Sequence, residues 1–232
     1  EEHIEVGKVI YSELFSTNQS IQSVKIPEGV TTIEEWAFDG CTSLRSVTFP
    51  ASVTTIGEGV FWGCNSLETI VLPKGVTMIG PRAFEQCISL ESVTVPVGVE
   101  TINWSMFLGC ISLTSVILPE GVALIDNGAF EQCESLVSII LPKGLTTICA
   151  AAFMTCESLV TMTIPDDVTT IERSAFCNCD SLSSVIFPQG LTTIEGGVFR
   201  NCPSLSSVIL PESVTTIGED AFDDSATVLV LM

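Results

Sequence analysis

One row of 23 residues, repeated without a gap, constrains the fold of this chain more than any other feature of its sequence. A clear copy runs from Cys64 to Gln86, and the next residue, Cys87, begins the row again. No insertion or deletion shifts the register between residues 20 and 224. Self-similarity at a period of this length predicts a solenoid, in which each row stacks on its neighbour. Phe recurs at 38, 61, 84, 107, 130, 153, 176, 199 and 222, and Ile at 33, 56, 79, 102, 125, 148, 171, 194 and 217.

Each row predicts two short strands followed by a turn. The segment 46–49 (Ser-Val-Thr-Phe) is β-rich and alternates in polarity, and Pro50 ends it because Pro cannot donate to a strand ladder. A second β-rich stretch covers 53–56, and the segment 59–64 predicts a single helical or 3₁₀ turn. We expect a solenoid of about nine such rows, with parallel strands on one side and the helical or 3₁₀ turns on the other.

The two ends of the chain depart from the repeat. Residues 1–19 predict a degenerate N-terminal capping row, because Asn18 stands where later rows have Cys. Residues 20–224 are the tandem repeats, and residues 225–232 predict a C-terminal cap or a truncated row, because Ser225 takes the Cys position. We expect one continuous domain. The N-terminus lacks an initiator Met and an apolar leader, so we also expect a processed chain or a fragment of a longer array.

Composition excludes two classes of partner. The chain carries 8 basic and 28 acidic residues, a formal net charge of −20. Phosphate recognition needs clustered Lys and Arg, so we expect no nucleic-acid partner. No apolar run reaches the roughly 18–20 residues that a membrane span requires, so we expect no insertion into a membrane.

Eight cysteines share one register and predict a column of buried structural thiols. Adjacent rows of a parallel stack lie about 4.8 Å apart, which a disulfide can span, but stacked side chains point the same way and disfavour the bond. A straight column does not converge on a metal ion either, so we expect small buried hydrophobes. Cys149 and Cys177 lie outside the column, and for them we expect free surface thiols, with one bridge as the alternative. The column consists of Cys41, Cys64, Cys87, Cys110, Cys133, Cys156, Cys179 and Cys202.

The sequence does not favour an enzyme. His3 is the only imidazole, whereas a Ser-His or Cys-His nucleophile needs a positioned one. The carboxylate pair Asp166-Asp167 falls at a turn and predicts solvated side chains. We therefore expect no catalytic site, no metal and no cofactor.

The row resembles the leucine-rich repeat of the BspA-like (Treponema pallidum) type. Leu44-x-x-Val47-x-Phe49 matches the general leucine-rich core, and Ile79, Ala83-Phe84 and Cys87 match the features of this subclass. The resemblance covers residues 20–224. It implies a curved, right-handed leucine-rich-repeat solenoid with a parallel sheet on its concave face. It also implies a secreted or cell-surface location and a role in adhesion, and it brings no catalytic motif.

The outward side chains of the first strand are the candidate partner-binding face. Ser or Thr occupies position 46 and its equivalents in every row, and position 48 and its equivalents become apolar along the chain. Because strand side chains alternate, both columns belong to one face. The candidate residues are Arg45, Thr48, Glu68, Val71, Glu91, Thr94, Ile117, Ile140, Thr163, Ile186 and Ile209.

Two interpretations of this face remain open. An exposed apolar stripe framed by hydroxyls is typical of a partner surface, here for a protein or a glycan. The same residues also suit a face that only stabilises its own sheet through β-propensity and hydroxyl ladders. The function expected is a non-catalytic binding module of the adhesion type. The alternative is a structural spacer or assembly segment of a larger surface protein, with no ligand of its own.

Overall fold

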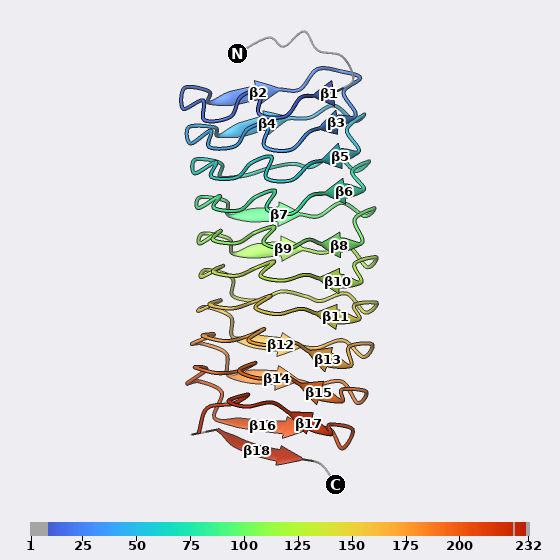
Figure 1. The fold of residues 1–232 in the computed structure, drawn as a ribbon, viewed down its shortest axis with the longest axis vertical. Coiled ribbons are helices and arrows are strands. Elements are labelled where there is room, and N and C mark those ends of the chain that lie inside the picture. Colours follow the sequence, from blue (N-terminus) through green and yellow to red (C-terminus); the bar gives the residue numbers. More distant parts are fainter. Residues whose placement is uncertain (1–8, 225, 231–232) are drawn as a thin grey trace.

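The computed structural model describes residues 9–224 and 226–230, which form a long stack of rows (Figure 1). The chain passes down the stack one row at a time, so that segments 23 residues apart lie side by side. Residues 1–8 of the expected N-terminal cap, which include His3, lie outside the described residues, as do Ser225 and residues 231–232 of the expected C-terminal segment.

The second strand of each row forms a nearly continuous column. Each pairs in parallel with at least one neighbour, and the column divides into a four-stranded and a six-stranded sheet between β6 and β8. Ten rows contribute a strand: nine belong to the tandem rows of residues 20–224, as expected, and β1 belongs to the degenerate N-terminal row. The strands are β1 (Val9–Ile10), β3 (Thr32–Ile33), β5 (Thr55–Ile56), β6 (Met78–Ile79), β8 (Thr101–Ile102), β10 (Leu124–Ile125), β11 (Thr147–Ile148), β13 (Thr170–Ile171), β15 (Thr193–Ile194) and β17 (Thr216–Ile217).

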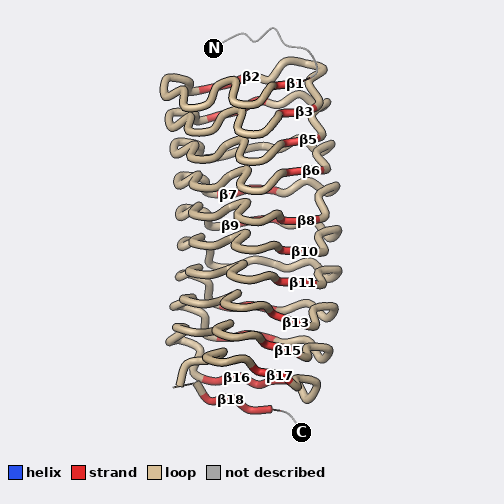
Figure 2. The backbone as a smooth tube through the Cα atoms, in the orientation of Figure 1, coloured by secondary structure: helices blue, strands red, loops and turns tan. Residues whose placement is uncertain are grey.

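The first strands pair only two by two. The four pairs are β2–β4, β7–β9, β12–β14 and β16–β18, all parallel. Figure 2 shows how short these strands are beside the loops and turns that make up most of each row. Their bounds are β2 (Ser23–Lys25), β4 (Ser46–Thr48), β7 (Ser92–Thr94), β9 (Ser115–Ile117), β12 (Thr161–Thr163), β14 (Ser184–Ile186), β16 (Ser207–Leu210) and β18 (Thr227–Val230).

Two rows lack the first strand that the repeat predicts. Residues 69–71 make only an isolated bridge, from Thr69 to Ser92, and residues 138–140 make none. These two rows have Ile at the inward central position, Ile70 and Ile139, where the other rows have Val or Met. We attribute the loss of pairing to the β-branched shape of Ile, which adds a methylene to Val where it cannot bend away, whereas the unbranched Met162 is accommodated in β12.

The helical or 3₁₀ turn expected for segment 59–64 is wrong, and no helix occurs within residues 9–224 and 226–230. The N–H of Phe61 donates to the carbonyl of Ala83 in the next row at 2.9 Å, instead of bonding within its own row. Two left-handed residues per row also exclude a helix, because helical residues need negative φ. One column of positive φ runs through Trp36, Gly59, Arg82, Ser105, Gly128, Ala151, Ser174, Gly197 and Asp220, the other through Gly40, Gly63, Gln86, Gly109, Gln132, Thr155, Asn178 and Asn201.

The core is a set of uniform columns. The Phe rings from Phe15 to Phe222 stack on one another with centroids 5.2 to 5.7 Å apart, and Phe49 packs edge-on against Phe61. Among the described residues, no polar or charged side chain is buried. A single apolar core therefore runs the length of the stack and holds the surface positions of each row in register.

Candidate partner-binding face

Strand alternation turns the predicted residues outward. In β9, Val116 is buried while Ser115 and Ile117 are exposed on either side of it; β2, β4, β7 and β12 follow the same alternation, and in β14 the central Val185 is half-buried. Pairing brings Thr94 next to Ile117, and Thr163 next to Ile186. We call these outward positions, together with the residue before each strand, the first-strand face. Every predicted face residue is exposed: Arg45, Thr48, Glu68, Val71, Glu91, Thr94, Ile117, Ile140, Thr163, Ile186 and Ile209.

Val71 and Ile140 are the most exposed apolar residues of this face, at 83% and 86%. Both belong to the rows that lack a first strand, so the structure does not bring them into a ladder with their neighbours. A side chain this exposed gains most when a partner covers it, because burial stabilises in proportion to the apolar area removed from water.

The N-terminal half of the face is charged. Arg45 and Glu68 form an ion pair at 3.8 Å, with both side chains more than half exposed. Lys25 and Glu91 are also exposed on this half. Exposed pairs of this kind contribute little free energy, so the charges mainly set the local potential.

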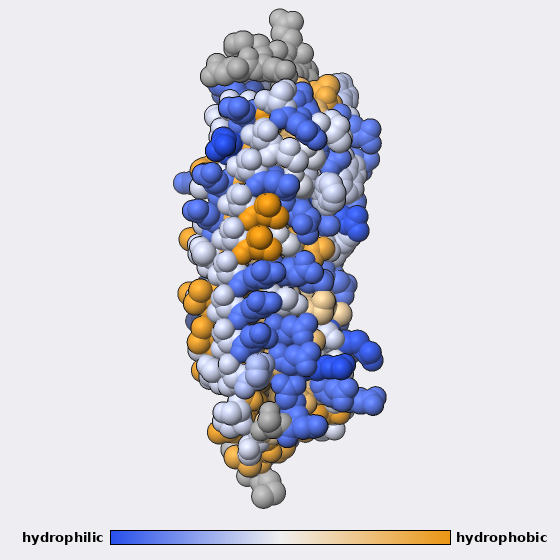
Figure 3. All heavy atoms as spheres, turned by 90° about the vertical axis from the view of Figure 1, so that its left-hand side faces the viewer, coloured by the Kyte–Doolittle hydropathy of each residue, from blue (hydrophilic) through white to orange (hydrophobic). Residues whose placement is uncertain are grey.

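The C-terminal half of the face carries no charge. In a chain of net charge −20, all its outward positions from Thr114 to Ile209 are Ser, Thr, Val or Ile. Apolar side chains gather along one margin of the molecule in Figure 3. The exposed positions are Thr114, Ser115, Ile117, Val137, Ser138, Ile140, Val160, Thr161, Thr163, Ser183, Ser184, Ile186, Ser206, Ser207 and Ile209.

The strand hydroxyls of the face are not used within the fold. The residues of the Ser/Thr column make no side-chain hydrogen bond to any described residue, although Thr114 and Ser183 beside them donate to carbonyls of Glu91 and Val160. A hydroxyl ladder would require such bonds between rows. These donors and acceptors are therefore available to a partner. The column consists of Ser23, Ser46, Thr69, Ser92, Ser115, Ser138, Thr161, Ser184 and Ser207.

Sequence reasoning missed two exposed apolar residues beside this face. Leu229 of β18 lies opposite Ile209 of β16 and is 56% exposed. The 23-residue period could not place it, because β18 follows β16 at an interval of 20 residues; the alternation of residues 227–230 was the signal available. Val97, 76% exposed, lies in the turn just after β7.

Aromatic side chains lie away from this face. Trp36, Trp62 and Trp104 belong to the turn segments between the second strand and the next first strand. The ring of Trp36 covers Gly59, where a Cβ would collide with it, and the Arg82 guanidinium lies 4.5 Å from the Trp104 ring centroid. The face therefore offers aliphatic and hydroxyl groups without a stacking platform.

A family comparison identifies this architecture. The model of the BspA type leucine rich repeat region, in six copies, matches residues 8–136 and 102–228. The chain belongs to the BspA-type leucine-rich repeat family. A comparison with curated proteins found no significant match.

Several solved structures are similar to this BspA-type chain, and the first two below share its fold. A leucine rich cell surface protein from Faecalibacterium prausnitzii is 30% identical, with a TM-score of 0.56, over 94% of this chain and 74% of that one. The pneumococcal vaccine antigen PcpA is 19% identical, with a TM-score of 0.51, over 91% and 64%. The Treponema pallidum leucine rich repeat protein is 26% identical, with a TM-score of 0.37, over 89% and 72%.

The Cys column of the BspA-type row has a defined role in the core. Each of the eight thiols is buried and free, and its Sγ donates to the carbonyl of the Phe one row back; the Sγ of Cys133 lies 3.3 Å from the carbonyl oxygen of Phe107. That carbonyl also accepts the N–H of Cys110 in its own row. The thiol therefore donates a second hydrogen bond to a buried carbonyl oxygen. A purely apolar side chain would leave that second acceptor site unused.

Burial suppresses the reactivity of these thiols. It raises the pKa of Cys41 to about 11, and it raises the pKa of Cys87 and Cys133 well above the usual thiol value. A thiol that holds its proton is neither a nucleophile nor a metal ligand at neutral pH. No group of three or more His, Cys, Asp or Glu side chains in the described parts of the chain could hold a metal ion.

The expectation that the thiols of Cys149 and Cys177 lie on the surface is wrong. Both are free, but both are buried, at 8% and 9% exposure. Burial, followed by the charge of Glu172, raises the pKa of Cys149 to about 12. Both residues lie in the turn segment, where the tight lateral packing of consecutive rows covers small side chains that sequence spacing alone leaves outside the core.

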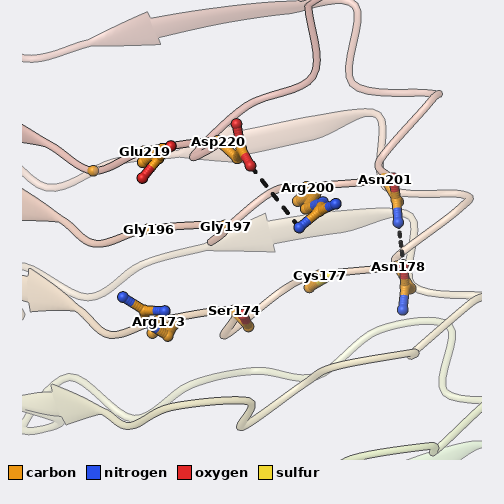
Figure 4. Close-up of a pocket in the computed structure, with 11 residues that line it drawn as sticks. Arg173, Ser174, Cys177, Asn178, Gly196, Gly197, Arg200, Asn201, Glu219 and Asp220 are labelled. Atoms are coloured by element: carbon orange, nitrogen blue, oxygen red, sulfur yellow. Dashed lines mark hydrogen bonds and ion pairs between the residues drawn. The ribbon is translucent and has the colours of Figure 1, made fainter.

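A polar hollow of about 460 Å³ lies in the turn segments of the last rows (Figure 4). Arg200 faces Asp220 at 3.9 Å, and the amide of Asn201 donates to that of Asn178 at 2.8 Å. Arg173 and Glu219 also line it, so two guanidinium groups oppose two carboxylates. This balance of charge selects neither an anion nor a cation.

No helix in residues 9–224 and 226–230 is long and apolar enough to cross a membrane.

Proposed function

We propose that this chain is a non-catalytic, cell-surface binding module that recognises a protein through the C-terminal half of its first-strand face. The observation that carries the proposal is the absence of charge from Thr114 to Ile209 on an exposed strand column, in a chain of net charge −20. A solvated face needs no such exclusion, whereas the centre of a protein interface is depleted in charge. A relative described as a cell surface protein supports the location.

The chemistry of the face favours a protein over a glycan. Ile117, Ile140 and Ile186 present aliphatic surface, and the hydroxyls of the Ser/Thr column beside them make no side-chain hydrogen bond to a described residue. Sugar rings are held by stacking on aromatic side chains, and the three Trp residues lie elsewhere. A spacer without a ligand would have no use for an apolar stripe that faces water, because such a stripe promotes non-specific association.

The test is binding of the purified chain to a panel of extracellular-matrix proteins and to a glycan array, measured by a surface biosensor. For any protein bound by the wild type, Ile117→Asp/Ile140→Asp/Ile186→Asp is expected to weaken binding by 100-fold or more, since each buried Ile contributes roughly 1.5–3 kcal/mol. The control is Met78→Asp/Ile111→Asp, which alters exposed apolar residues off the face. Equal binding by both variants, or binding to glycans alone, would overturn the proposal.

A further inference from the structure

The first-strand face is hollowed beside residues 138–140, one of the two segments that lack a first strand. A depression of about 750 Å³ lies between the row of Ile140 and the row of Thr163. Ile140, Leu141 and Ile164 provide apolar walls. Lys143, Asp166 and Asp167 also line it, and each lies in the turn that follows the first-strand position of its row. The depression therefore combines apolar walls with a charged end.

The backbone beside this hollow is unpaired. No hydrogen bond joins the N–H or C=O groups of residues 138–141 to any other described residue, whereas the flanking pairs β7–β9 and β12–β14 are hydrogen-bonded strands. Ile139 and Leu141 are buried, so this segment is only partly open to water. Unpaired backbone acceptors at a partly buried site favour a donor from water or from a ligand.

The acidic end of the hollow is a departure from the repeat. Asp167 occupies a turn position that is Gly or Ser in the other rows, and Asp166 precedes it. Both carboxylates are exposed, and together they outnumber the single Lys143. The hollow therefore has a net negative end in a chain whose overall charge is −20, so it attracts cations.

These three features match one kind of group. We propose that the hollow is the anchor of the binding face and takes a long cationic side chain, Lys or Arg, from the partner polypeptide. The inference rests on the proposed function and adds the chemistry of the partner. The alkyl stem of such a side chain packs against Ile140 and Ile164, as such stems do on apolar surfaces. Its head group donates to the free carbonyls of residues 138–141 and pairs with Asp166 and Asp167.

The first test uses fragments of the partner side chain. N-acetyl-arginine amide and N-acetyl-lysine amide are titrated into the full chain, and the amide resonances of Thr161, Thr163 and Ile140 are followed by NMR. Both are expected to shift these resonances, with a dissociation constant about tenfold lower than that of N-acetyl-citrulline amide, which has a similar shape but no charge. Equal effects of the charged and neutral fragments, or shifts elsewhere only, would overturn the proposal.

The second test removes the acidic end. Asp166→Asn/Asp167→Asn keeps the size of both side chains and is expected to cancel the tenfold preference for the charged fragments. Glu157→Gln/Asp180→Asn is the matched control, since both are exposed acids outside the hollow. Loss of the preference in both variants would assign the effect to overall charge and overturn the proposal.

Failure here and failure of the proposed function give different results. Ile117 and Ile186 lie in other rows than the residues that line the hollow. If Ile117→Asp/Ile186→Asp weakens binding to a matrix protein but the fragments do not bind in the hollow, the proposed binding face stands and the proposal of a cationic anchor is rejected.

Sedimentation velocity tests whether a second copy of this chain occupies the hollow. Dimerisation that Lys25→Gln/Arg45→Gln abolishes would overturn the proposal of a separate partner.

Discussion

The two strand columns of this solenoid differ in regularity although they belong to the same rows. The second strands repeat Thr-Ile with few changes and pair almost without interruption. The first strands pair only two by two, are missing at residues 69–71 and 138–140, and carry the exposed apolar stripe. The regular column stabilises the stack, and the irregular one is free to vary because its outward side chains are not packed. The difference assigns stability to the second-strand side of each row, and under the proposed function the first-strand side carries recognition.

The largest effect is expected from alkaline pH acting on the buried thiols of the regular part. A thiol with a raised pKa keeps its proton in the folded chain when the unfolded chain has lost it. The contribution of these thiols to stability is therefore constant below the unfolded pKa of about 8.5 and falls as the pH rises towards the folded values, about 11 for Cys41 and 12 for Cys149. Each such thiol contributes a slope of roughly 1.4 kcal/mol per pH unit.

Urea denaturation at pH 7.5, 9 and 10.5 measures this slope. Cys149→Ala is the matched variant, because it removes one thiol outside the column and should reduce the slope. Thiol counting in denaturant should find the ten free groups of the native structure. A stability that stays flat above pH 9, or two or fewer free thiols, would contradict the buried column.

A direct comparison of the columns uses two isoleucines. Ile125 in β10 is fully buried and Ile117 in β9 is 63% exposed. Ile125→Ala is expected to cost about 2–5 kcal/mol of unfolding free energy, as buried truncations do. Ile117→Ala should change stability by less than about 0.5 kcal/mol. Chemical denaturation checks both, and similar losses would remove the division between the columns.

The gap in the first-strand column should respond to the size of one inward side chain. Ile139→Val removes one methylene and is expected to let residues 138–140 pair with their neighbours. The loss of buried apolar area should cost about 0.5–1.5 kcal/mol of unfolding free energy. Each new backbone hydrogen bond should offset this loss by about 0.5–1.5 kcal/mol. Hydrogen exchange at Ile139 and Ile140 should slow. The converse variant, Val116→Ile, should speed exchange in β9, and unchanged protection in both would reject packing as the cause.

The smallest effect is expected at the charged half of the face. Arg45→Gln breaks the exposed pair with Glu68, and the change in stability should lie within about 0.5 kcal/mol. Because the pair lies in the N-terminal half, affinity for a partner bound by the C-terminal half should change less than with Ile140→Asp. A larger loss with Arg45→Gln would move the binding site towards the charged rows.

The period of 23 residues was sufficient to predict the solenoid, the uniform core columns and the outward direction of Thr48 or Ile117. Periodicity does this because a side chain that repeats in every row stacks on its own copies. The buried, free thiols of the Cys column followed from the same argument.

Other features depended on contacts between rows, which no single row encodes. The turns are not helical because N–H groups such as that of Phe61 bond to the next row, and left-handed residues such as Arg82 and Gln86 accept this geometry without being Gly. The burial of Cys149 and the position of Leu229 also depend on neighbouring rows. Likewise, the sequence determined which residues face outward, whereas only the packing of neighbouring rows shows that Ile70 and Ile139 interrupt the first-strand column. The hollow beside Ile140 exists because backbone spacing depends on how the whole stack packs.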